Sequence, residues 1–175
     1  MNNTEALKLA QAYIQANEPC DLSWESDPAC AFWFNGNPEA DEHFHVFATR
    51  GDGSLLALWK KSGAALDSCP VVLLGGEGEL AVLGDDVARA LALMATIGSV
   101  DFQVFVNAGA KDDEGAVDEP SDAGEDKVLE PDDAFAEWTK TTLGVERPRR
   151  VAKTLIAAMK RHEGLVKLAR GLVKR

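Results

Sequence analysis

The chain has 175 residues, of which 46% are hydrophobic and 27% charged, and its net charge at pH 7 is −11. This length suits one globular domain and is short for two. The excess of acid argues against nucleic-acid binding by the acidic body, because phosphates would be repelled, and it favours a basic protein partner. No apolar stretch reaches the roughly 20 residues that cross a bilayer, and no signal-peptide pattern opens the chain, so we expect a cytoplasmic protein without a membrane partner.

The N-terminal segment predicts a helix over residues 3–17. Leu7, Ala10 and Ile14 recur near helical spacing, and the Glu18-Pro19 pair ends the helix. The cysteines Cys20, Cys30 and Cys69 are odd in number and form no CxxC pair. That pattern indicates buried thiols in a reducing compartment rather than disulfides or a zinc site.

Between residues 30 and 83 the pattern changes to short β-type runs separated by turns. We expect strands at CAFWF (30–34), HFHVFATR (43–50), SLLALW (54–59), VVLL (71–74) and ELAVL (79–83). In the second run, alternation places Phe44, Val46 and Ala48 on one face. NGNPEADE (35–42) predicts a turn or loop, and the glycines at 51–53 and 75–78 supply the positive φ values that tight turns need.

A second helix is expected over residues 87–98. Asp85 is the predicted N-cap, with Asp86 beside it, and Gly98 is the predicted stop. DFQVFV (101–106) predicts one more strand. Residues 111–130 are dense in acid and nearly empty of large apolar side chains, which predicts a mobile acidic loop. A short helix follows, capped by Pro131-Asp132 and closed by Gly144.

The last segment reverses the charge. Residues 1–144 hold 27 acidic and 8 basic residues, a net charge of −19, whereas residues 145–175 hold 2 acidic and 10 basic residues, a net charge of +8. Pro148 suits the first turn of a basic C-terminal helix. Its apolar stripe is Val151, Leu155, Ala158, Met159, His162, Leu165, Ala169 and Leu172. Packing of this stripe on the domain is favoured, and an anionic membrane or a nucleic-acid backbone is the alternative.

These elements predict one α+β domain, in which a mostly antiparallel or mixed sheet is flanked by helices. Three pieces between residues 46 and 95 resemble the SUKH superfamily: GDGSLLALW, PVVLLGGEGELAVLG and DDVARALALMA, in that order. The resemblance implies a single α+β domain and a bacterial immunity protein that neutralises a toxin, often a nuclease, by binding it. The chain departs from the family at Asn35-Gly36, which follows an aromatic run where the family usually has a Tyr-rich helical segment.

Candidate chemistry is sparse. His43 and His45 would share a strand face and invite a metal ion, yet further ligands such as Asp41 or Glu42 would be needed, so we expect none. Glu77 and Glu79 flank Gly78 without a nucleophile or base nearby in sequence. No phosphate-binding loop or catalytic triad is present. We therefore expect no catalytic, cofactor-binding or metal-binding residues.

The sequence thus favours a protein-binding module that holds a basic toxin domain. A regulatory scaffold without a toxin partner is the alternative, and a small hydrolase is a weaker one. The partner-binding candidates are Trp59, Glu77, Glu79, Asp85 and Asp86: the tryptophan ends a strand where the family has an aromatic residue, and no buried role is evident for the four acids.

Overall fold

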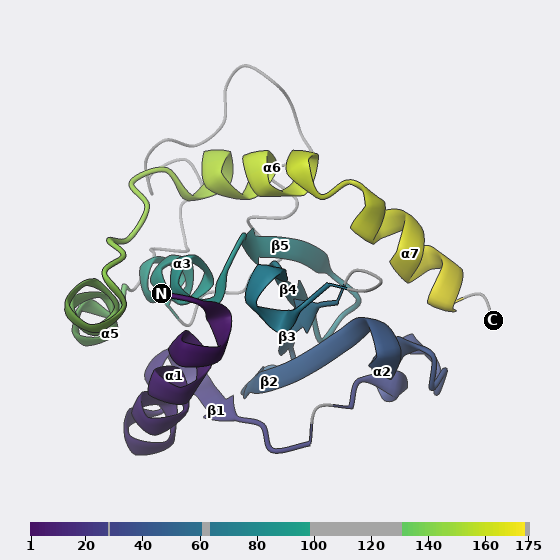
Figure 1. The fold of residues 1–175 in the computed structure, drawn as a ribbon, viewed down its shortest axis with the longest axis horizontal. Helices are drawn as coiled ribbons and strands as arrows, with labels where there is room; N and C mark the ends of the chain where they lie inside the picture. The colour runs from purple at the N-terminus through teal and green to yellow at the C-terminus, as the bar shows by residue number, and fades with distance from the viewer. Residues whose placement is uncertain (28, 61–63, 99–130, 174–175) are drawn as a thin grey trace.

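The structure is a computed structural model, and it describes residues 1–27, 29–60, 64–98 and 131–173. Its centre is a five-stranded sheet in the order β1-β2-β3-β4-β5, and every neighbouring pair is antiparallel (Figure 1). The strands are β1 (Leu22–Trp24), β2 (Phe44–Arg50), β3 (Leu55–Trp59), β4 (Val71–Leu74) and β5 (Leu80–Gly84). Together with helices around it, this sheet confirms the α+β fold.

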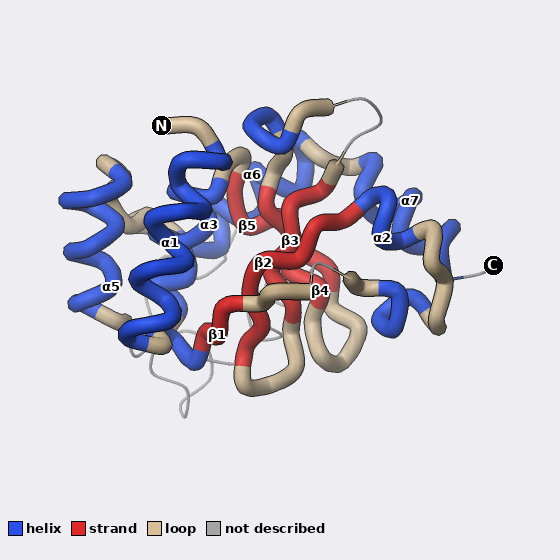
Figure 2. The backbone as a smooth tube through the Cα atoms, turned by 60° about the horizontal axis from the view of Figure 1, so that its bottom comes forward, coloured by secondary structure: helices blue, strands red, loops and turns tan. Residues whose placement is uncertain are grey.

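The helices lie on both faces of the sheet and along one edge (Figure 2). The longer ones are α1 (Asn3–Asn17), α3 (Val87–Ile97), α5 (Asp133–Trp138), α6 (Val151–Arg161) and α7 (Gly164–Val173). The shorter ones are η1 (Pro19–Asp21), η2 (Ala31–Phe34), α2 (Ala40–His43), η3 (Leu66–Ser68) and the π-helical turn η5 (Thr139–Leu143).

Strand alternation divides the interior into two cores. Leu56 and Leu58 of β3 face α1, α3 and α5, whereas Leu55 and Ala57 face η2, α6 and α7. All five residues of β3 are buried, because helices cover both faces of the sheet at its middle strand. A continuous apolar run such as LLALW therefore fits this position better than an alternating one.

Much of the element prediction is confirmed. The first helix spans the expected residues and ends at Glu18, which has a left-handed conformation (φ +45°). The hairpins β2–β3 and β4–β5 turn where the glycines predicted them, with Gly53 at φ +85° and Gly78 at φ +94°. The segment after residue 130 also behaves as expected, since Asp132 caps α5 and Gly144 closes the turn that follows.

The strand expected at residues 30–34 is wrong, because Ala31–Phe34 forms a 3-10 helix. The aromatic residues have high strand propensity, but tertiary contacts decide the local geometry. Phe34 stacks on Phe44 at 5.2 Å between ring centroids, and Trp33 donates its indole N–H to the carbonyl oxygen of Gly75 (2.7 Å). Both consecutive side chains pack on the same core, whereas successive side chains of a strand point to opposite faces.

The expected face of β2 also needs correction. His43 ends α2 instead of joining the strand, and the predicted loop before it contains that short helix. Phe44 and Val46 face the α6–α7 side, but Ala48 faces the α1–α3 side. A bulge between Val46 and Ala48 shifts the register and ends the simple alternation.

The start of α3 differs by one residue from the prediction. Asp86, not Asp85, is the N-cap, and its Oδ1 accepts the backbone N–H of Arg89 (2.8 Å). Gly98 ends the helix as expected.

The predicted C-terminal helix is two helices. It begins at Val151, so Pro148 lies before its first turn, and it breaks at His162 and Glu163 between α6 and α7. The stripe itself packs as favoured: Leu155, Ala158 and Leu165 are at most 5% exposed. The break lets α6 follow the edge of the sheet while α7 turns across its face toward η2.

Helix α6 covers the outer edge of β5, which among the described residues pairs only with β4. The backbone N–H of Val82 donates to the sulfur of Met159 (3.1 Å). An uncovered edge strand presents unpaired backbone groups that recruit other chains. The apolar stripe of α6 therefore protects this edge. The strand predicted at 101–106 and the acidic loop predicted at 111–130 lie outside the described residues.

Candidate functional site

The antiparallel meander places its connections at two opposite ends of the sheet. One end, the turn edge, holds the start of β1 and the β2–β3 and β4–β5 turns. The other end, the histidine edge, holds the start of β2, the end of β3 and the step from β5 into α3. Residues far apart in sequence thus gather at either end, and the two ends differ in charge and chemistry.

Backbone contacts join the segments of the turn edge. The N–H of Gly51 donates to the carbonyl oxygen of Asp21 (3.1 Å), which ties the first turn to the start of β1. The N–H of Gly76 donates to the hydroxyl oxygen of Ser54 (3.1 Å), which ties the two hairpin turns together. These contacts hold three separate segments side by side as one surface.

The exposed charge of the turn edge is acidic. Asp21, Asp52 and Glu77 are exposed and Glu79 is half-buried. The base nearest to them is Arg50, whose side chain is 3% exposed and whose guanidinium lies 3.4 Å from the carboxylate of Asp52. Because that base is buried, the exposed charge of the turn edge is that of Asp21, Asp52 and Glu77, one carboxylate from each of three segments.

Glu77 and Glu79 sit in this turn as the sequence predicts, and their backbone roles are now visible. The side chain of Glu79 folds back, and its Oε2 accepts the N–H of Glu77 (3.1 Å). The carbonyl oxygen of Glu79 also accepts the N–H of Gly75 (2.7 Å). Glu79 therefore shapes the turn, while the carboxylate of Glu77 is left to solvent or to a partner.

An exposed aromatic side chain lies on the short helix that contacts the β4–β5 turn. Phe32 on η2 is 68% exposed, and its neighbour Trp33 is hydrogen-bonded to Gly75 at the base of the β4–β5 turn. The end of α7 adjoins the same helix, since Asn37 donates to the carbonyl oxygen of Leu172 (2.9 Å). Val173, the next residue, is 41% exposed. Phe32 and Val173 thus expose apolar surface around η2, the helix that Trp33 ties to the β4–β5 turn.

Asp85 and Asp86 lie at the opposite end of β5 from Glu77 and Glu79, so the four acids do not form one surface. Asp85 is held by Arg161 (Nη2 to Oδ2, 3.0 Å) and by His162 (Nε2 to Oδ1, 2.9 Å). Burial alone would raise the pKa of Asp85, but the hydrogen bonds from His162 and Arg161 outweigh it and lower that pKa. Asp86 caps α3 and pairs with Arg89. Both carboxylates therefore have structural partners.

Trp59 is a core residue, 6% exposed, on the face of β3 that meets α6 and α7. Its ring meets the imidazole of His162 edge-on at 6.2 Å between centroids. Trp59 consequently exposes almost no surface that a partner could contact.

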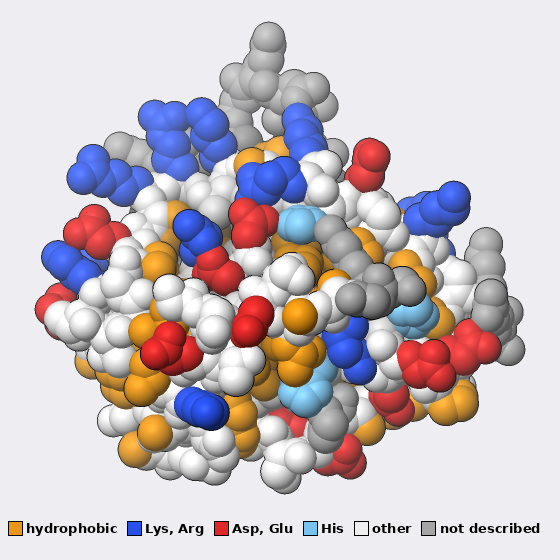
Figure 3. Space-filling view, viewed as in Figure 1, with side chains coloured by type: hydrophobic (Ala, Val, Ile, Leu, Met, Phe, Trp, Pro, Cys, Tyr) orange, Lys and Arg blue, Asp and Glu red, His pale blue; other side chains and the backbone are white. Residues whose placement is uncertain are grey.

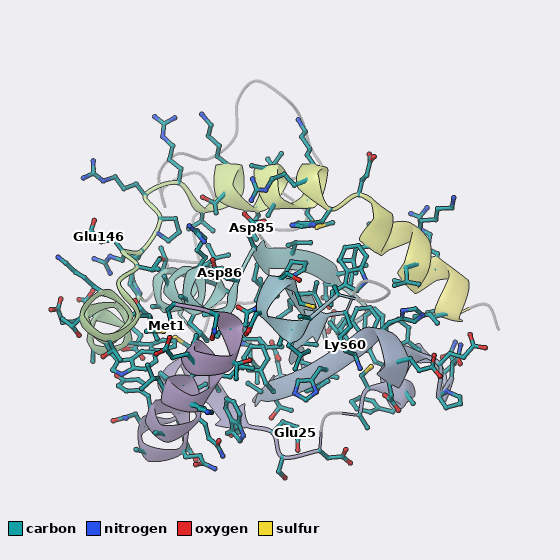
Figure 4. The ribbon with its side chains drawn as sticks, in the orientation of Figure 1. Met1, Glu25, Lys60, Asp85, Asp86 and Glu146 are labelled. Atoms are coloured by element: carbon teal, nitrogen blue, oxygen red, sulfur yellow. The ribbon has the colours of Figure 1, made fainter. Side chains whose placement is uncertain are left out.

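The histidine edge gathers the titratable side chains that a catalytic or metal site would use. Figure 4 labels Glu25, Lys60 and Asp85, which follow β1, β3 and β5 along this edge, and histidine side chains lie across the same face in Figure 3. A cavity of about 130 Å³ is lined by Asp27, Asp41, His45 and Lys60, among others. Burial first, and the Lys60 ammonium second, lower the pKa of His45.

The chemistry of the histidine edge is limited in the part of the chain that the structure describes. No three His, Cys, Asp or Glu side chains are arranged there to hold a metal ion. Cys30 lies beside Asp41, and burial followed by the charge of that carboxylate raises its pKa to about 12. Cys20 lies before the start of β1, away from this edge, and burial followed by the charge of Asp132 raises its pKa to about 12 as well. A nucleophilic cysteine needs a lowered pKa, so these two thiols are poor nucleophiles.

Comparison of the chain with family models, with curated proteins and with solved structures finds no match. Among the described residues, no helix is both long enough and apolar enough to pass through a membrane.

The sequence predicted two of the four acidic residues of the turn edge and missed the other two, together with Phe32. Glu77 and Glu79 stood out because they flank a glycine turn, but Asp21, Asp52 and Phe32 did not. Asp52 lies between two glycines of a predicted hairpin, so its exposure could have been inferred. The placement of Phe32 could not, because it depends on the 3-10 helix and on the anchoring of Trp33 to Gly75.

Proposed function

We propose that the protein is a protein-binding module and that a basic partner docks on the turn edge. The observation that carries this proposal is a set of carboxylates from three segments held together by backbone contacts, next to the helix that Trp33 anchors at Gly75 and that carries the exposed aromatic side chain of Phe32. Aromatic side chains supply much of the energy at the centre of interfaces, and surrounding charges set the rate and the choice of partner.

The resemblance to the SUKH superfamily supports a specific form of this function, the neutralisation of a toxin by direct binding. A basic toxin domain, such as a nuclease, would present the positive surface that the turn edge attracts. Occlusion of a catalytic surface would need no catalytic group on this chain, which agrees with the poorly nucleophilic thiols of Cys20 and Cys30.

The test is affinity purification from the native cell with two matched triple variants. The first is Phe32→Ala, Asp52→Asn, Glu77→Gln at the turn edge. The second is Leu9→Ala, Glu5→Gln, Glu18→Gln, which removes one exposed apolar side chain and two exposed charges at α1. A basic protein that the wild type and the second variant retain, and the first variant loses, supports the proposal. Loss with both variants, or with neither, contradicts it.

The identified partner then separates the toxin from the scaffold hypothesis. The partner's own activity is measured with increasing amounts of this chain. Stoichiometric inhibition supports neutralisation, whereas binding without inhibition supports a scaffold. Hydrolase and nuclease activity of the pure chain above background, abolished by replacing His45 or Glu77 with Ala, would overturn the binding-module hypothesis.

A further inference from the structure

The outer surface of the C-terminal helices, here called the basic face, carries the opposite charge to the turn edge. Its exposed members are Arg149, Arg150, Lys153, Lys160, Arg161, Lys167 and Arg170. In Figure 3, Lys and Arg side chains gather over α6 and the segment before it. Only two acids, Glu146 and Glu163, fall among residues 145–175.

The burial of the apolar stripe limits what this surface can bind. Leu155, Leu165 and Leu172 are each at most 5% exposed, because they pack on the sheet. A helix that lies in a membrane interface must bury such a stripe among lipid tails. The apolar stripe here is already buried in the core, so only the charges of the basic face could interact with a membrane.

Several of these bases remain available for a ligand. Arg161 is held by Asp85. By contrast, no carboxylate of the described residues lies within ion-pair distance of Lys153, Lys160 or Lys167. Lys153 and Lys160 lie seven residues apart in α6, which is two helical turns or about 10 Å, so they share one side of that helix. Lys167 is exposed on α7, beyond the break at His162 and Glu163.

The length and composition of the basic face fit a long, regular polyanion. Helices of 11 and 10 residues extend about 16 and 15 Å, and one turn of duplex DNA is about 34 Å. Residues 145–175 contain no Phe, Tyr, Trp, Asn or Gln. The aromatic side chains that stack on bases and the Asn or Gln side chains that read adenine are thus absent, and the Lys and Arg side chains that remain can bind phosphates of any sequence.

The acidic body does not cancel this attraction. Charge interactions in physiological salt are screened beyond about 8 Å. The turn edge lies at the end of the sheet, whereas α6 covers the side of β5. A nucleic acid on the basic face would therefore lie mainly against the Lys and Arg side chains of that face. We infer that the basic face binds double-stranded nucleic acid through its phosphates, without sequence preference.

The test is fluorescence anisotropy of a labelled DNA duplex of roughly 20 base pairs, two helical turns, with the full chain. Binding is expected at about 0.05 M salt, with affinity falling linearly on a log–log plot as salt rises. Lys153→Gln, Lys160→Gln should weaken binding by roughly tenfold and lower the salt slope by about 2, since each lost phosphate contact removes about 0.9. Circular dichroism confirms that the variants fold.

The matched control is Lys8→Gln, Arg89→Gln, which removes the same net charge from α1 and α3. It should leave the affinity within about twofold, because those positions are not on the basic face. Equal weakening by both double variants would overturn the inference, as would absence of binding at low salt. Tighter binding to polyglutamate, or to vesicles with anionic lipid, would assign the face to an acidic protein or a membrane instead. None of these outcomes bears on the turn edge.

Discussion

Asn3 shows how one buried polar side chain can organise a fold. It is 1% exposed, and its amide nitrogen donates to the carbonyl oxygens of Leu66 and Cys69, each at 2.8 Å. Its amide oxygen accepts the N–H of Val87, also at 2.8 Å. One side chain thus connects the first turn of α1 with η3 and with the start of α3.

Replacing Asn3 with Ala should lower the free energy of unfolding by about 3 kcal/mol, because it leaves buried backbone groups without their partners. The matched control is Asn2→Ala, which removes the N-cap of α1 and should cost about 1 kcal/mol. Urea unfolding followed by circular dichroism measures both. Equal losses in the two variants would show that the Asn3 bridge adds nothing beyond helix capping.

Asp85 links the end of β5 to the break between α6 and α7 through Arg161 and His162. Its pKa is lowered below the ordinary value of 3.8, so the folded state binds the Asp85 proton less readily than the unfolded state. Its contribution to stability is therefore complete above pH 3.8 and disappears as the pH falls through the lower, folded-state pKa.

Replacing Asp85 with Asn should therefore lower stability at pH 7 and make the loss of stability below pH 4 less steep. The contribution of Asp85 to the free energy of unfolding is modest, because its side chain is 44% exposed and solvent screens its ion pairs. Melting temperatures from pH 2.5 to pH 7 test this, with Asp27→Asn as an exposed control. Parallel profiles for wild type and Asp85→Asn would contradict the assignment.

At the scale of elements, α6 is the part of the fold that closes the sheet. Its inward side chains reach both cores, since Leu155 joins the α1–α3 side and Ala158 the α7 side. The helix therefore covers the β5 edge and seals the interior on both sides of it.

Replacing Leu155 with Ala should cost about 2 to 5 kcal/mol, the usual range for a buried leucine. Lys153→Ala, on the exposed side of the same helix, should stay within about 0.5 kcal/mol of wild type. Chemical unfolding gives both values, and light scattering reports whether the weakened edge promotes association. A loss below about 1 kcal/mol for Leu155→Ala would mean that α6 does not seal the core.

Residues 111–130 carry a prediction from composition alone. Segments with dense like charge and few apolar residues contribute little to a core. Replacing them with a short Gly-Ser linker should change the melting temperature by only a few degrees. A collapse of the melting temperature would show that the segment packs against the domain.

At the scale of the whole molecule, charge is separated between the turn edge and the basic face. The net charge of −11 conceals this arrangement, because the C-terminal segment contributes +8. The fold places α6 along the side of β5, whereas the β2–β3 and β4–β5 turns meet at the end of the sheet. Two surfaces of opposite sign can therefore serve two different partners.

If the turn edge receives the basic partner, association should depend strongly on salt. Raising salt from about 0.05 to 0.5 M should slow association markedly and change dissociation less, because rim charges act mainly on the on-rate. Asp52→Asn, Glu77→Gln should reduce both the on-rate and its salt dependence, whereas Phe32→Ala should speed dissociation. Surface plasmon resonance separates the two rates. Asp85→Asn, Asp86→Asn is the matched control, and an equal effect on the on-rate would remove the turn edge from consideration.

The sequence by itself determined most of the local structure. Helix periodicity identified α1 and α3, and the glycines at 53, 78 and 98 marked turns or ends that the structure confirms. Short apolar runs identified β3, β4 and β5. These signals are local, because they arise from backbone preferences and from side-chain spacing within one element. The short strand β1, only three residues long, carries too little pattern to be recognised in this way.

Tertiary structure alone decided which residues share a surface. Phe32 belongs to a 3-10 helix because Trp33 and Phe34 find partners in the β4–β5 turn and on β2, and strand propensity does not reflect those contacts. Asp85 is not the N-cap of α3; its carboxylate instead binds Arg161 and His162, which lie more than 70 residues later in the chain. Glu77 and Asp85 are close in sequence yet lie at opposite ends of β5, while Asp21 and Asp52 are distant in sequence yet meet at one edge. An antiparallel meander has this effect because each strand reverses the direction of the last, so the turns alternate between the two ends of the sheet.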